Sequence, residues 1–363
     1  MRVVIVGCGI IGATIAYELS RISGLEITVC DRQLPACEAT GAALGVLMGI
    51  ISQKTKGRSW ELRQDSMKRY DSLVSKLEAA TGEKIPYNRN GILKLLYPGD
   101  KIEKWQNLVE VRAGQGWNLQ LLDIEAVRDR FSYLNLDRAI AAIYSPDDRQ
   151  VDPVALTKAL VAASRKNGVR FEFDFAVTDA DIESSDPSEL KHCQVVKQGT
   201  RKIECDRLIL AAGLGSTPFT QKLDRPTNLI PVLGQALQLK LDGDLGNSEP
   251  IITADDVHIV PLRNGEYWVG ATVEFPPETG ELVADPQQLD TVLKRAIAFC
   301  PPLETGTIVR QWQGLRPRPQ NEAAPILRSL PGYNNIMLAT GHYRNGILLA
   351  PATAKAVCHW LSS

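Results

Sequence analysis

Three glycines near the N-terminus and an aspartate roughly twenty residues later carry the clearest chemical signal in the sequence. Gly7, Gly9 and Gly12 form the pattern G-x-G-x-x-G, which follows a short apolar run and precedes Asp31. Gly7 allows a tight turn, Gly9 lets a pyrophosphate approach the backbone, and Gly12 lets a helix pack closely on a strand. The first N–H groups of that helix attract phosphates, and Asp31 can accept hydrogen bonds from a ribose. The spacing therefore predicts a dinucleotide-binding unit.

Two further features favour FAD over a nicotinamide cofactor in this unit. The run of small residues Thr40–Gly45 follows the predicted ribose position and lets the backbone approach a bulky flat ligand. The chain also returns to the same strand and helix pattern at about 150–215 and at 335–363. A long FAD lies across a sheet assembled from separated segments, whereas a nicotinamide domain is usually contiguous. We therefore expect FAD.

Arg344 is the leading candidate for holding an anionic substrate. It lies in the expected turn Gly341–Asn345, just before the last helix of the chain. An arginine at this position opposes the helix dipole, which is unfavourable unless an anion lies nearby. An amino-acid carboxylate held by two hydrogen bonds would offset that cost. The position of Arg344 therefore predicts a carboxylate site.

Short strands and helices must position these residues. Apolar β-branched runs predict parallel strands at Arg2–Gly7 and Leu25–Cys30, and the apolar spacing between them predicts a helix at Ile10–Ile22. The same criteria predict strands at Gly91–Tyr97, Gly168–Ala176, Arg207–Gly213 and Asn335–Thr340, and helices at Trp60–Ala80, Val109–Gly114, Asp123–Phe131, Asp152–Lys166 and from the final turn to Leu361.

Residues 227–313 differ in character, because strand-like runs there alternate with turn signals such as Arg263-Asn-Gly265. The runs are Gly234–Leu241, Val257–Pro261, Glu266–Val273 and Thr307–Gln313. The fold class expected is mixed α/β, with a Rossmann-type FAD-binding domain and a substrate domain built mostly on an antiparallel sheet. We assign residues 1–50, 146–226 and 314–363 to the FAD-binding domain, and residues 51–145 and 227–313 to the substrate domain.

Composition excludes several classes of protein. The 363 residues carry a formal net charge of −1, which argues against nucleic acid as a partner. Seven cysteines without a CxxC pair and four scattered histidines argue against a disulfide framework and a metal site. The longest apolar run, Ala42–Ile51, is too short to span a bilayer. We expect a soluble cytoplasmic protein that binds no membrane and can form a homo-oligomer.

The chain resembles the D-amino-acid oxidase type of FAD-dependent amine oxidoreductases over essentially its whole length. Within that superfamily it is most similar to the glycine oxidases of thiamine biosynthesis. The motifs that carry the resemblance are Gly7–Gly12 with Asp31-Arg32, Leu210–Gly213, Gly314–Pro317 and, most specifically, Gly341–Pro351.

The resemblance implies roles for individual residues. Backbone amides from Asn345 to Leu348 would hold the flavin pyrimidine edge. Relatives with covalent flavin carry a cysteine just after the stretch Gly314–Pro317, and Arg318–Pro325 here contains none. Arg316 would assist Arg344 in holding the carboxylate, His258 stands where relatives often have a tyrosine, and Tyr343 flanks Arg344. The full expected cofactor set is Gly7, Gly9, Ile10, Ile11, Gly12, Asp31, Arg32, Thr40, Ala42, Ala43, Gly45, Val177, Ala212, Gly213, Gly341, His342, Arg344, Asn345, Gly346, Ile347 and Leu348.

The reaction implied is transfer of a hydride from the Cα of a small amino acid or N-methyl amino acid to noncovalent FAD. Hydrolysis of the imino acid then gives a 2-oxo acid and ammonia or an amine, and molecular oxygen becomes hydrogen peroxide. No side-chain base is required, because the cofactor performs the difficult step. One alternative is a D-amino-acid dehydrogenase that passes electrons to a quinone or another carrier, with membrane contact near Leu47–Ile51. A second is a flavin-binding subunit without catalytic turnover.

Overall fold

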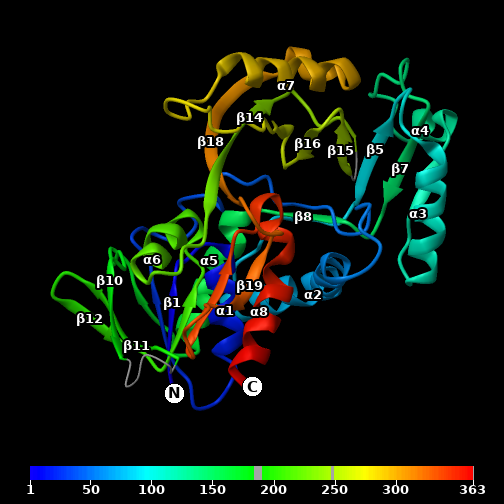
Figure 1. Ribbon diagram of the computed structural model, residues 1–363. Coiled ribbons are helices and arrows are strands. Elements are labelled where there is room, and N and C mark those ends of the chain that lie inside the picture. Colours follow the sequence, from blue (N-terminus) through cyan, green and yellow to red (C-terminus); the bar gives the residue numbers. More distant parts are fainter. Residues whose placement is uncertain (184–189, 247–248, 363) are drawn as a thin grey trace.

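A six-stranded sheet forms the lower half of the molecule in Figure 1 and joins distant parts of the chain. The structure is a computed structural model that describes residues 1–183, 190–246 and 249–362. The strands lie in the order β19-β20-β13-β1-β2-β9, and all neighbours are parallel except the pair β19 and β20. Their bounds are β1 Arg2–Val6, β2 Glu26–Cys30, β9 Arg170–Glu172, β13 Arg207–Leu210, β19 Ile326–Ser329 and β20 Ile336–Thr340.

Four helices pack together against this sheet: α1 Ile10–Leu19, α2 Arg58–Thr81, α5 Pro153–Lys166 and α8 Gly346–Ser362. The start of α5 is fixed locally, because the Asp152 side chain accepts hydrogen bonds from the N–H groups of Val154 and Ala155 at 2.8 and 2.9 Å. Pro153 occupies the first turn, where its missing N–H has no consequence. The predicted start of this helix is confirmed.

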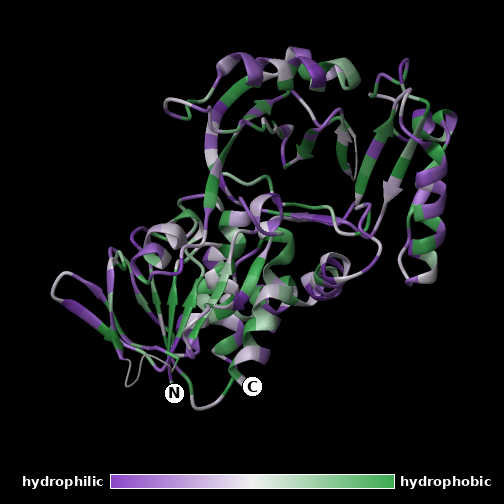
Figure 2. Cartoon of the chain, in the orientation of Figure 1, coloured by the Kyte–Doolittle hydropathy of each residue, from purple (hydrophilic) through white to green (hydrophobic). Residues whose placement is uncertain are grey.

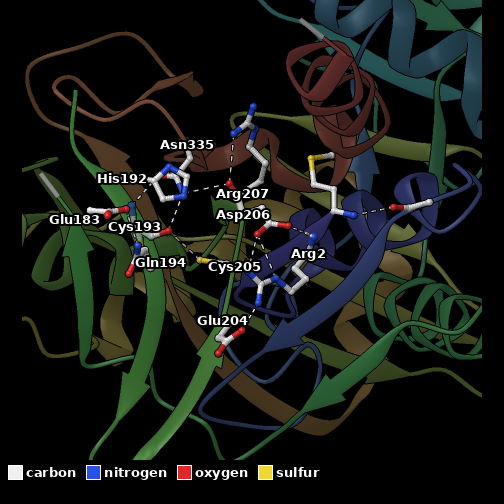
Figure 3. Close-up of polar contacts among 12 residues, drawn as sticks. Arg2, Glu183, His192, Cys193, Gln194, Glu204, Cys205, Asp206, Arg207 and Asn335 are labelled. Carbon is white, nitrogen blue, oxygen red and sulfur yellow. Dashed lines mark hydrogen bonds and ion pairs between the residues drawn. The ribbon is translucent and has the colours of Figure 1, made fainter. Parts of the chain in front are cut away.

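A three-stranded antiparallel sheet packs beside the six-stranded sheet, at the left in Figure 1. Its strands are β10 Asp179–Glu183, β11 His192–Gln198 and β12 Arg201–Glu204. Figure 3 shows how buried Asn335 joins the two sheets: it accepts from the Cys193 N–H at 2.9 Å and donates to the Cys193 carbonyl at 2.7 Å. Arg2 adds an ion pair with Asp206 at 2.7 Å.

An eight-stranded sheet forms the upper half of Figure 1, in the order β18-β14-β17-β16-β15-β5-β7-β6. All neighbouring strands are antiparallel except β15 and β5. The bounds are β5 Ile92–Leu96, β6 Gln120–Leu122, β7 Ala141–Ser145, β14 Leu229–Lys240, β15 Ile251–Ala254, β16 Val257–Pro261, β17 Glu266–Gly270 and β18 Thr307–Pro319.

Helix α7 (Pro286–Phe299) covers one face of the eight-stranded sheet with a stripe of buried residues at helical spacing, Leu289, Val292, Ala296 and Phe299. The opposite face packs on Leu44 and Ile51, which come from the N-terminal part of the chain. Helices α3 (Ile102–Gly114) and α4 (Ile124–Arg130) follow β5 and β6 at the outer end of this sheet. The face that meets Leu44 therefore looks toward the glycine-rich N-terminal region.

Short elements link the two large sheets. Strands β3 (Val46–Leu47), β8 (Arg149–Val151) and β4 (Tyr87–Asn88) form a small antiparallel sheet. The remaining elements are helix α6 (Ser216–Lys222) and the 3-10 turns η1 (Gly213–Gly215), η2 (Pro301–Thr305) and η3 (Tyr343–Asn345).

The expected fold class is confirmed, and several predicted boundaries are wrong. The helix predicted to reach Ile22 ends at Leu19, and the strand predicted at 168–176 covers only Arg170–Glu172. Strand β18 continues to Pro319 because it pairs with β14 along its whole length, a long-range contact without a local signal. Figure 2 shows the apolar strands of the six-stranded sheet that made its core predictable. Helix α7 and strands β7 and β15 were not predicted at all.

The proposed division into domains stays a prediction. Strand β18 runs without a break across the proposed boundary between residues 313 and 314. Within the described chain no helix is both long and apolar enough to cross a membrane. The same residues contain no cluster of three or more histidine, cysteine or acidic side chains that could hold a metal.

Candidate flavin and substrate site

The glycine-rich loop between β1 and α1 has no room for side chains at two of its three glycines. Gly7 has a φ of +104°, and a Cβ there would lie 2.5 Å from the Ala211 carbonyl oxygen. A Cβ on Gly12 would lie 1.9 Å from the Gly7 carbonyl oxygen. Gly9 is different, because the nearest atom to a Cβ there is the Thr40 hydroxyl at 3.0 Å. The fold requires Gly7 and Gly12, whereas the space over Gly9 remains open.

Asp31 lies at the end of β2, directly beside this loop. Its carboxylate accepts hydrogen bonds from the N–H groups of Cys8 at 2.5 Å and Gln33 at 2.9 Å. Burial raises the pKa of Asp31, and the two N–H donors partly oppose that effect. Arg32 turns away and pairs with Glu38 at 2.6 Å. Asp31 therefore stands where the sequence predicts a ribose acceptor. The side chain of Arg32 is paired with Glu38, and its predicted contact with the cofactor stays a prediction.

The first turn of α1 presents unused hydrogen-bond donors. The N–H of Ile10 donates to the Thr40 hydroxyl at 3.0 Å. Among the described residues, the N–H groups of Ile11 and Gly12 have no acceptor. Such donors at a helix start favour an anion. Burial raises the pKa of the Cys8 thiol in this loop, which leaves it protonated and unreactive at neutral pH.

The segment of small residues after Asp31 lies between the two large sheets. The Trp312 indole N–H donates to the Ala42 carbonyl at 3.1 Å, and a Cβ on Gly314 would lie 2.3 Å from the Cβ of Ala42. Gly45 has a φ of +72°, and a Cβ there would lie 1.8 Å from the Val151 carbonyl oxygen, so no side chain fits at this position. Ala43 packs on the core of the six-stranded sheet. In the structure Ala42 of this run packs closely on β18 of the eight-stranded sheet, and the predicted approach of the run to a flat ligand stays a prediction.

Three further predicted cofactor residues, Ala212, Gly213 and Val177, come from the central part of the sequence. The Ala211 N–H bonds the Val6 carbonyl at 2.8 Å, which places Ala212 and Gly213 next to the loop; Gly213 has a φ of +54°. Val177 is partly buried against the core that contains Val6.

The turn before α8 has an unusual backbone. Gly341 and Tyr343 have φ values of +65° and +54°, and a tyrosine in this region is a strained residue of the kind found at functional sites. The Asn345 N–H is engaged by the His342 carbonyl at 3.0 Å, so of the four predicted amide donors it is the least available. The His342 ring is buried and bonds the Thr353 hydroxyl at 2.9 Å, and burial lowers its pKa to about 3. His342 therefore fixes the turn on α8.

Helix α2 holds the start of α8 through contacts that the sequence did not reveal. Pro351 lies inside α8 and has no N–H for the carbonyl of Ile347. The Tyr70 hydroxyl donates to that carbonyl instead, and the Ala352 N–H donates to the Ser66 hydroxyl at 3.2 Å. Apolar residues spaced three and four apart in the sequence predicted helix α2. The contacts of Tyr70 and Ser66 with the first turns of α8 are visible only in the packed structure.

Two arginines lie near the face of the eight-stranded sheet that looks toward the glycine loop: Arg316 on β18, and Arg344 in the turn η3, which packs on β18. The Arg316 guanidinium lies directly over Gly234, whose absent Cβ would be 2.2 Å from it, and donates to the carbonyls of Leu233 at 3.0 Å and Thr272 at 3.1 Å. Burial lowers the pKa of Arg316, and the nearby charge of Arg344 lowers it further. In the described chain Arg344 is exposed and has no hydrogen-bonded or ionic partner. The two charges thus lie close enough to influence each other, and among the described residues neither arginine forms an ion pair with a carboxylate.

His258 lies on the same face and completes this group. Its Nδ1 atom is buried and has no hydrogen-bond partner among the described residues. Burial lowers the pKa of His258 to about 4, and the charges of Arg344 and Lys94 contribute to the shift. The ring is therefore neutral at pH 7 and keeps one unsatisfied nitrogen, which is unusual for a buried polar group.

Lys94 was not predicted as a site residue. Strand register places it across Thr253 from His258, on the same sheet face. Its signal in the sequence is one lysine in the otherwise apolar strand Ile92-Leu93-Lys94-Leu95-Leu96. The acidic side chain near Arg316, Glu274, is engaged elsewhere: it accepts from Gln235 and from the Asp285 N–H, both at 2.9 Å. The positive charges of Lys94, Arg316 and Arg344 therefore all act on His258, and Asp256 opposes them.

Tyr343 lies at the outer edge of this group. Its ring is 5.8 Å from the guanidinium carbon of Arg318, which also stacks on exposed Phe275 at 5.1 Å. In this structure the Tyr343 side chain contacts Arg318, and its predicted contact with substrate stays a prediction.

A separate cavity of about 530 Å³ lies at the other end of β1, beside Arg2, His192 and Asp206 (Figure 3). Ligands of parallel α/β sheets bind at the carboxyl ends of the strands, and this cavity lies at the amino ends. Arg2 is already paired there with Asp206 and Glu204. This cavity is therefore distinct from the candidate site.

Comparisons with known proteins identify the family of the chain. The family model described as FAD dependent oxidoreductase matches residues 2–360. The chain is 33% identical to the bifunctional protein ThiO/ThiG of Synechocystis sp. over 98% of its length, and it spans only 50% of that relative. It is 27% identical to the glycine oxidase of Bacillus subtilis, covering 98% of this chain and 91% of the relative.

A solved structure, the glycine oxidase of Bacillus cereus, superposes with a TM-score of 0.87 at 27% identity, covering 99% of this chain and 94% of that one. The chain thus spans about half the length of the first curated relatives and nearly all of the glycine oxidases. The glycine loop with Asp31, the separated segments of the central sheet and these matches lead to one conclusion: the chain belongs to the FAD dependent oxidoreductase family.

Proposed function

We propose that the protein is a glycine oxidase-like enzyme that oxidises a small amino acid or N-methyl amino acid, such as glycine, sarcosine or D-alanine. The observation that carries the proposal is the pair Arg316 and Arg344 beside neutral His258, with no carboxylate bonded to Arg344 in the described chain. Two adjacent guanidinium groups without a counter-charge are unfavourable unless an anion binds them. An amino-acid carboxylate is an anion of suitable size and geometry.

The residues present fit noncovalent FAD. The open space over Gly9 and the free N–H groups of Ile11 and Gly12 suit a pyrophosphate, and Asp31 suits a ribose. The N–H groups of Gly346, Ile347 and Leu348 open α8 and suit the pyrimidine edge of the flavin. No cysteine occurs between Arg318 and Pro325 to attach it covalently. When bound, FAD would supply the acceptor for the hydride that leaves the substrate Cα.

The side chains of this protein would mainly orient the substrate. Arg344 and Arg316 would fix the carboxylate, and this fixes the direction in which the Cα–H bond points. The unsatisfied Nδ1 of His258 can accept a hydrogen bond from a substrate N–H if the other ring nitrogen carries the proton. At neutral pH the ring adds no positive charge to the site, so it would not repel a protonated substrate amine.

An anaerobic bleaching screen tests the proposal directly. The purified yellow protein is mixed with glycine, sarcosine, D-alanine or L-proline without air, and loss of the flavin absorbance is recorded; air is then admitted and peroxide is measured. Bleaching followed by stoichiometric peroxide supports the oxidase. Bleaching that a dye reverses and oxygen does not would support the dehydrogenase instead. No bleaching by any of the amino acids would contradict the proposed substrate class.

A role in thiamine biosynthesis is part of the same proposal. It rests on the similarity to the bifunctional protein ThiO/ThiG, of which this chain spans half. Growth of a thiamine-dependent strain that lacks its own glycine oxidase, restored by this chain without thiamine, would support it.

A further inference from the structure

Arg63 places a half-buried positive charge at the start of α8. It belongs to helix α2, and its guanidinium donates to the Ser59 carbonyl and hydroxyl, both at 2.9 Å, and to the Asn345 side-chain oxygen at 3.3 Å. Its Nε atom is buried and has no hydrogen-bond partner in the described chain. Ser59 lies one turn away on the same helix, so among the described residues Asn345 is the one hydrogen-bond partner of Arg63 outside α2.

No carboxylate balances this charge within the described residues. On α2 the nearby acidic side chains are Glu61, which is exposed, and Asp65, which already pairs with Arg69 at 3.2 Å and Lys355 at 3.0 Å. Burial alone lowers the pKa of Arg63, with no acidic neighbour to oppose it. A half-buried guanidinium with an unsatisfied donor is costly for a protein that gains nothing from it.

The position of Arg63 is also unfavourable for α8 itself. A cation close to the amino end of a helix opposes the helix dipole. Arg112 is a second buried cation in the neighbourhood; burial lowers its pKa to about 10, and the charge of Arg63 contributes to that shift. A negative charge next to the first N–H groups of α8 would stabilise the Arg63 charge at this position. That negative charge would be attracted both by the helix dipole and by Arg63.

We propose that Arg63 raises the electron affinity of the flavin by stabilising the negative charge that reduction places on its pyrimidine edge. This inference rests on the proposed function, which puts that edge at the start of α8. Charge near N1 of a flavin is one of the means by which proteins tune the electronics of the ring. Arg63 would act through its charge and through its bond to Asn345, without contact with the substrate.

Two substitutions separate charge from hydrogen bonding. Arg63→Gln removes the charge and keeps an amide donor for Asn345. Arg63→Lys keeps the charge and loses the planar guanidinium with its fixed set of N–H donors. Arg69→Met is the matched control, since Arg69 is on the same helix and already paired with Asp65. The probe is sulfite, whose electron pair forms a bond to flavin N5 and displaces negative charge onto N1 and the adjacent carbonyl. The dissociation constant for sulfite and the two-electron reduction potential are measured on the flavin-loaded proteins.

We expect Arg63→Gln to raise the sulfite dissociation constant about tenfold or more and to lower the reduction potential, a tenfold change corresponding to about 30 mV. Arg63→Lys should stay within about threefold of the parent, and Arg69→Met should not differ from it. Equal shifts in the Gln and Lys variants, or no shift in either, would overturn the role of charge. If Arg63→Gln fails to hold flavin, the Lys variant decides: a parent-like value supports the role of charge, and a tenfold weakening overturns it. A parent protein that binds no FAD would instead overturn the proposed function.

Discussion

The Tyr70 hydroxyl donates a hydrogen bond to the backbone carbonyl of Ile347, the acceptor that Pro351 leaves without a donor in α8. A proline inside a helix removes one hydrogen bond and leaves the carbonyl four residues earlier unsatisfied. Here a side chain from α2, 277 residues away in sequence, satisfies that carbonyl. The first turn of α8, where we place the flavin edge, is therefore set by contact with another helix.

Removal of this bond should destabilise the protein measurably. Tyr70 is fully buried, so Tyr70→Phe leaves the Ile347 carbonyl without a partner and should lower the free energy of unfolding by about 1–3 kcal/mol. Tyr87→Phe is the control, because the Tyr87 hydroxyl bonds the exposed Asp71 carboxylate and its loss should cost less than about 1 kcal/mol. Urea unfolding followed by circular dichroism measures both. Equal stabilities of the two variants would contradict the assigned role.

The glycines of the loop should separate folding from flavin binding. In Gly9→Val the added Cβ has the Thr40 hydroxyl, at 3.0 Å, as its one close neighbour among the described residues, so the fold should persist while bound FAD is lost. Gly12→Ala should prevent close packing of α1 on β1 and unfold the protein, because its Cβ would lie 1.9 Å from the Gly7 oxygen.

Visible absorbance and thermal unfolding distinguish the two outcomes. Gly114→Val, with open space around its Cβ, controls for the added side chain. A yellow Gly9→Val protein would rule out the pyrophosphate position.

Arg344 should be required for substrate and dispensable for cofactor. Arg344→Met removes a charged donor to the substrate carboxylate and should lower kcat/KM for amino acids by the equivalent of about 2–5 kcal/mol while FAD content stays unchanged. Arg318→Met is a suitable control, since Arg318 is exposed and stacks on the adjacent Tyr343 ring. Steady-state kinetics and flavin absorbance give the result. Similar kinetics in both variants would remove Arg344 from the site.

The neutral His258 predicts a particular dependence of stability on pH. Its pKa in the folded protein is about 4, below its ordinary value of 6.5, so the unfolded chain takes up a proton first as the pH falls. The contribution of His258 to stability is therefore complete above pH 6.5 and is lost as the pH falls toward 4. His258→Tyr should lose less stability than the parent between pH 7 and pH 5. Urea unfolding at the two pH values measures this, and identical losses would mean that His258 is not neutral in the folded state.

The loop after β3 is held from both sides by two buried groups. The Asp148 carboxylate accepts from the N–H groups of Gly49 at 2.7 Å and of Ile50 at 2.8 Å. Arg112 donates to the carbonyls of Ile50 and Ser52, both at 2.7 Å, and lies 3.6 Å above the Trp60 ring.

Arg112→Met should destabilise the protein by about 3–5 kcal/mol, because the carbonyls of Ile50, Ser52 and Lys54 lose their donor. Trypsin should then cleave faster after exposed Lys54 and Lys56. The control is Arg138→Met, because Arg138 is exposed and its loss should leave cleavage at the parent rate. Cleavage of Arg112→Met at the parent rate would show that Arg112 is not needed to hold the loop after β3.

The sequence by itself determined the family and the fold class. The glycine pattern, the buried strand before it and Asp31 lie within thirty-one residues, so local sequence suffices to define this unit. Arg344 was expected as a carboxylate ligand from its position before the last helix, and Arg316 from the family resemblance. In the structure the charge of Arg344 lies close enough to lower the pKa of Arg316, although 27 residues lie between them in the sequence, and their carboxylate-binding role stays a prediction.

Only the tertiary structure decided which of the remaining side chains meet. Lys94 and His258 share one sheet face through the pairing of strands that are far apart in sequence. His342 turned out to bond Thr353, and Arg32 to bond Glu38, because burial and nearby partners decide where a polar side chain points. The contacts of α2 with α8, including Tyr70 and Arg63, have no local signal, since the pattern of α2 specifies only that it is a helix with one apolar face. Long-range packing fixes these positions, and residue spacing along the chain does not encode it.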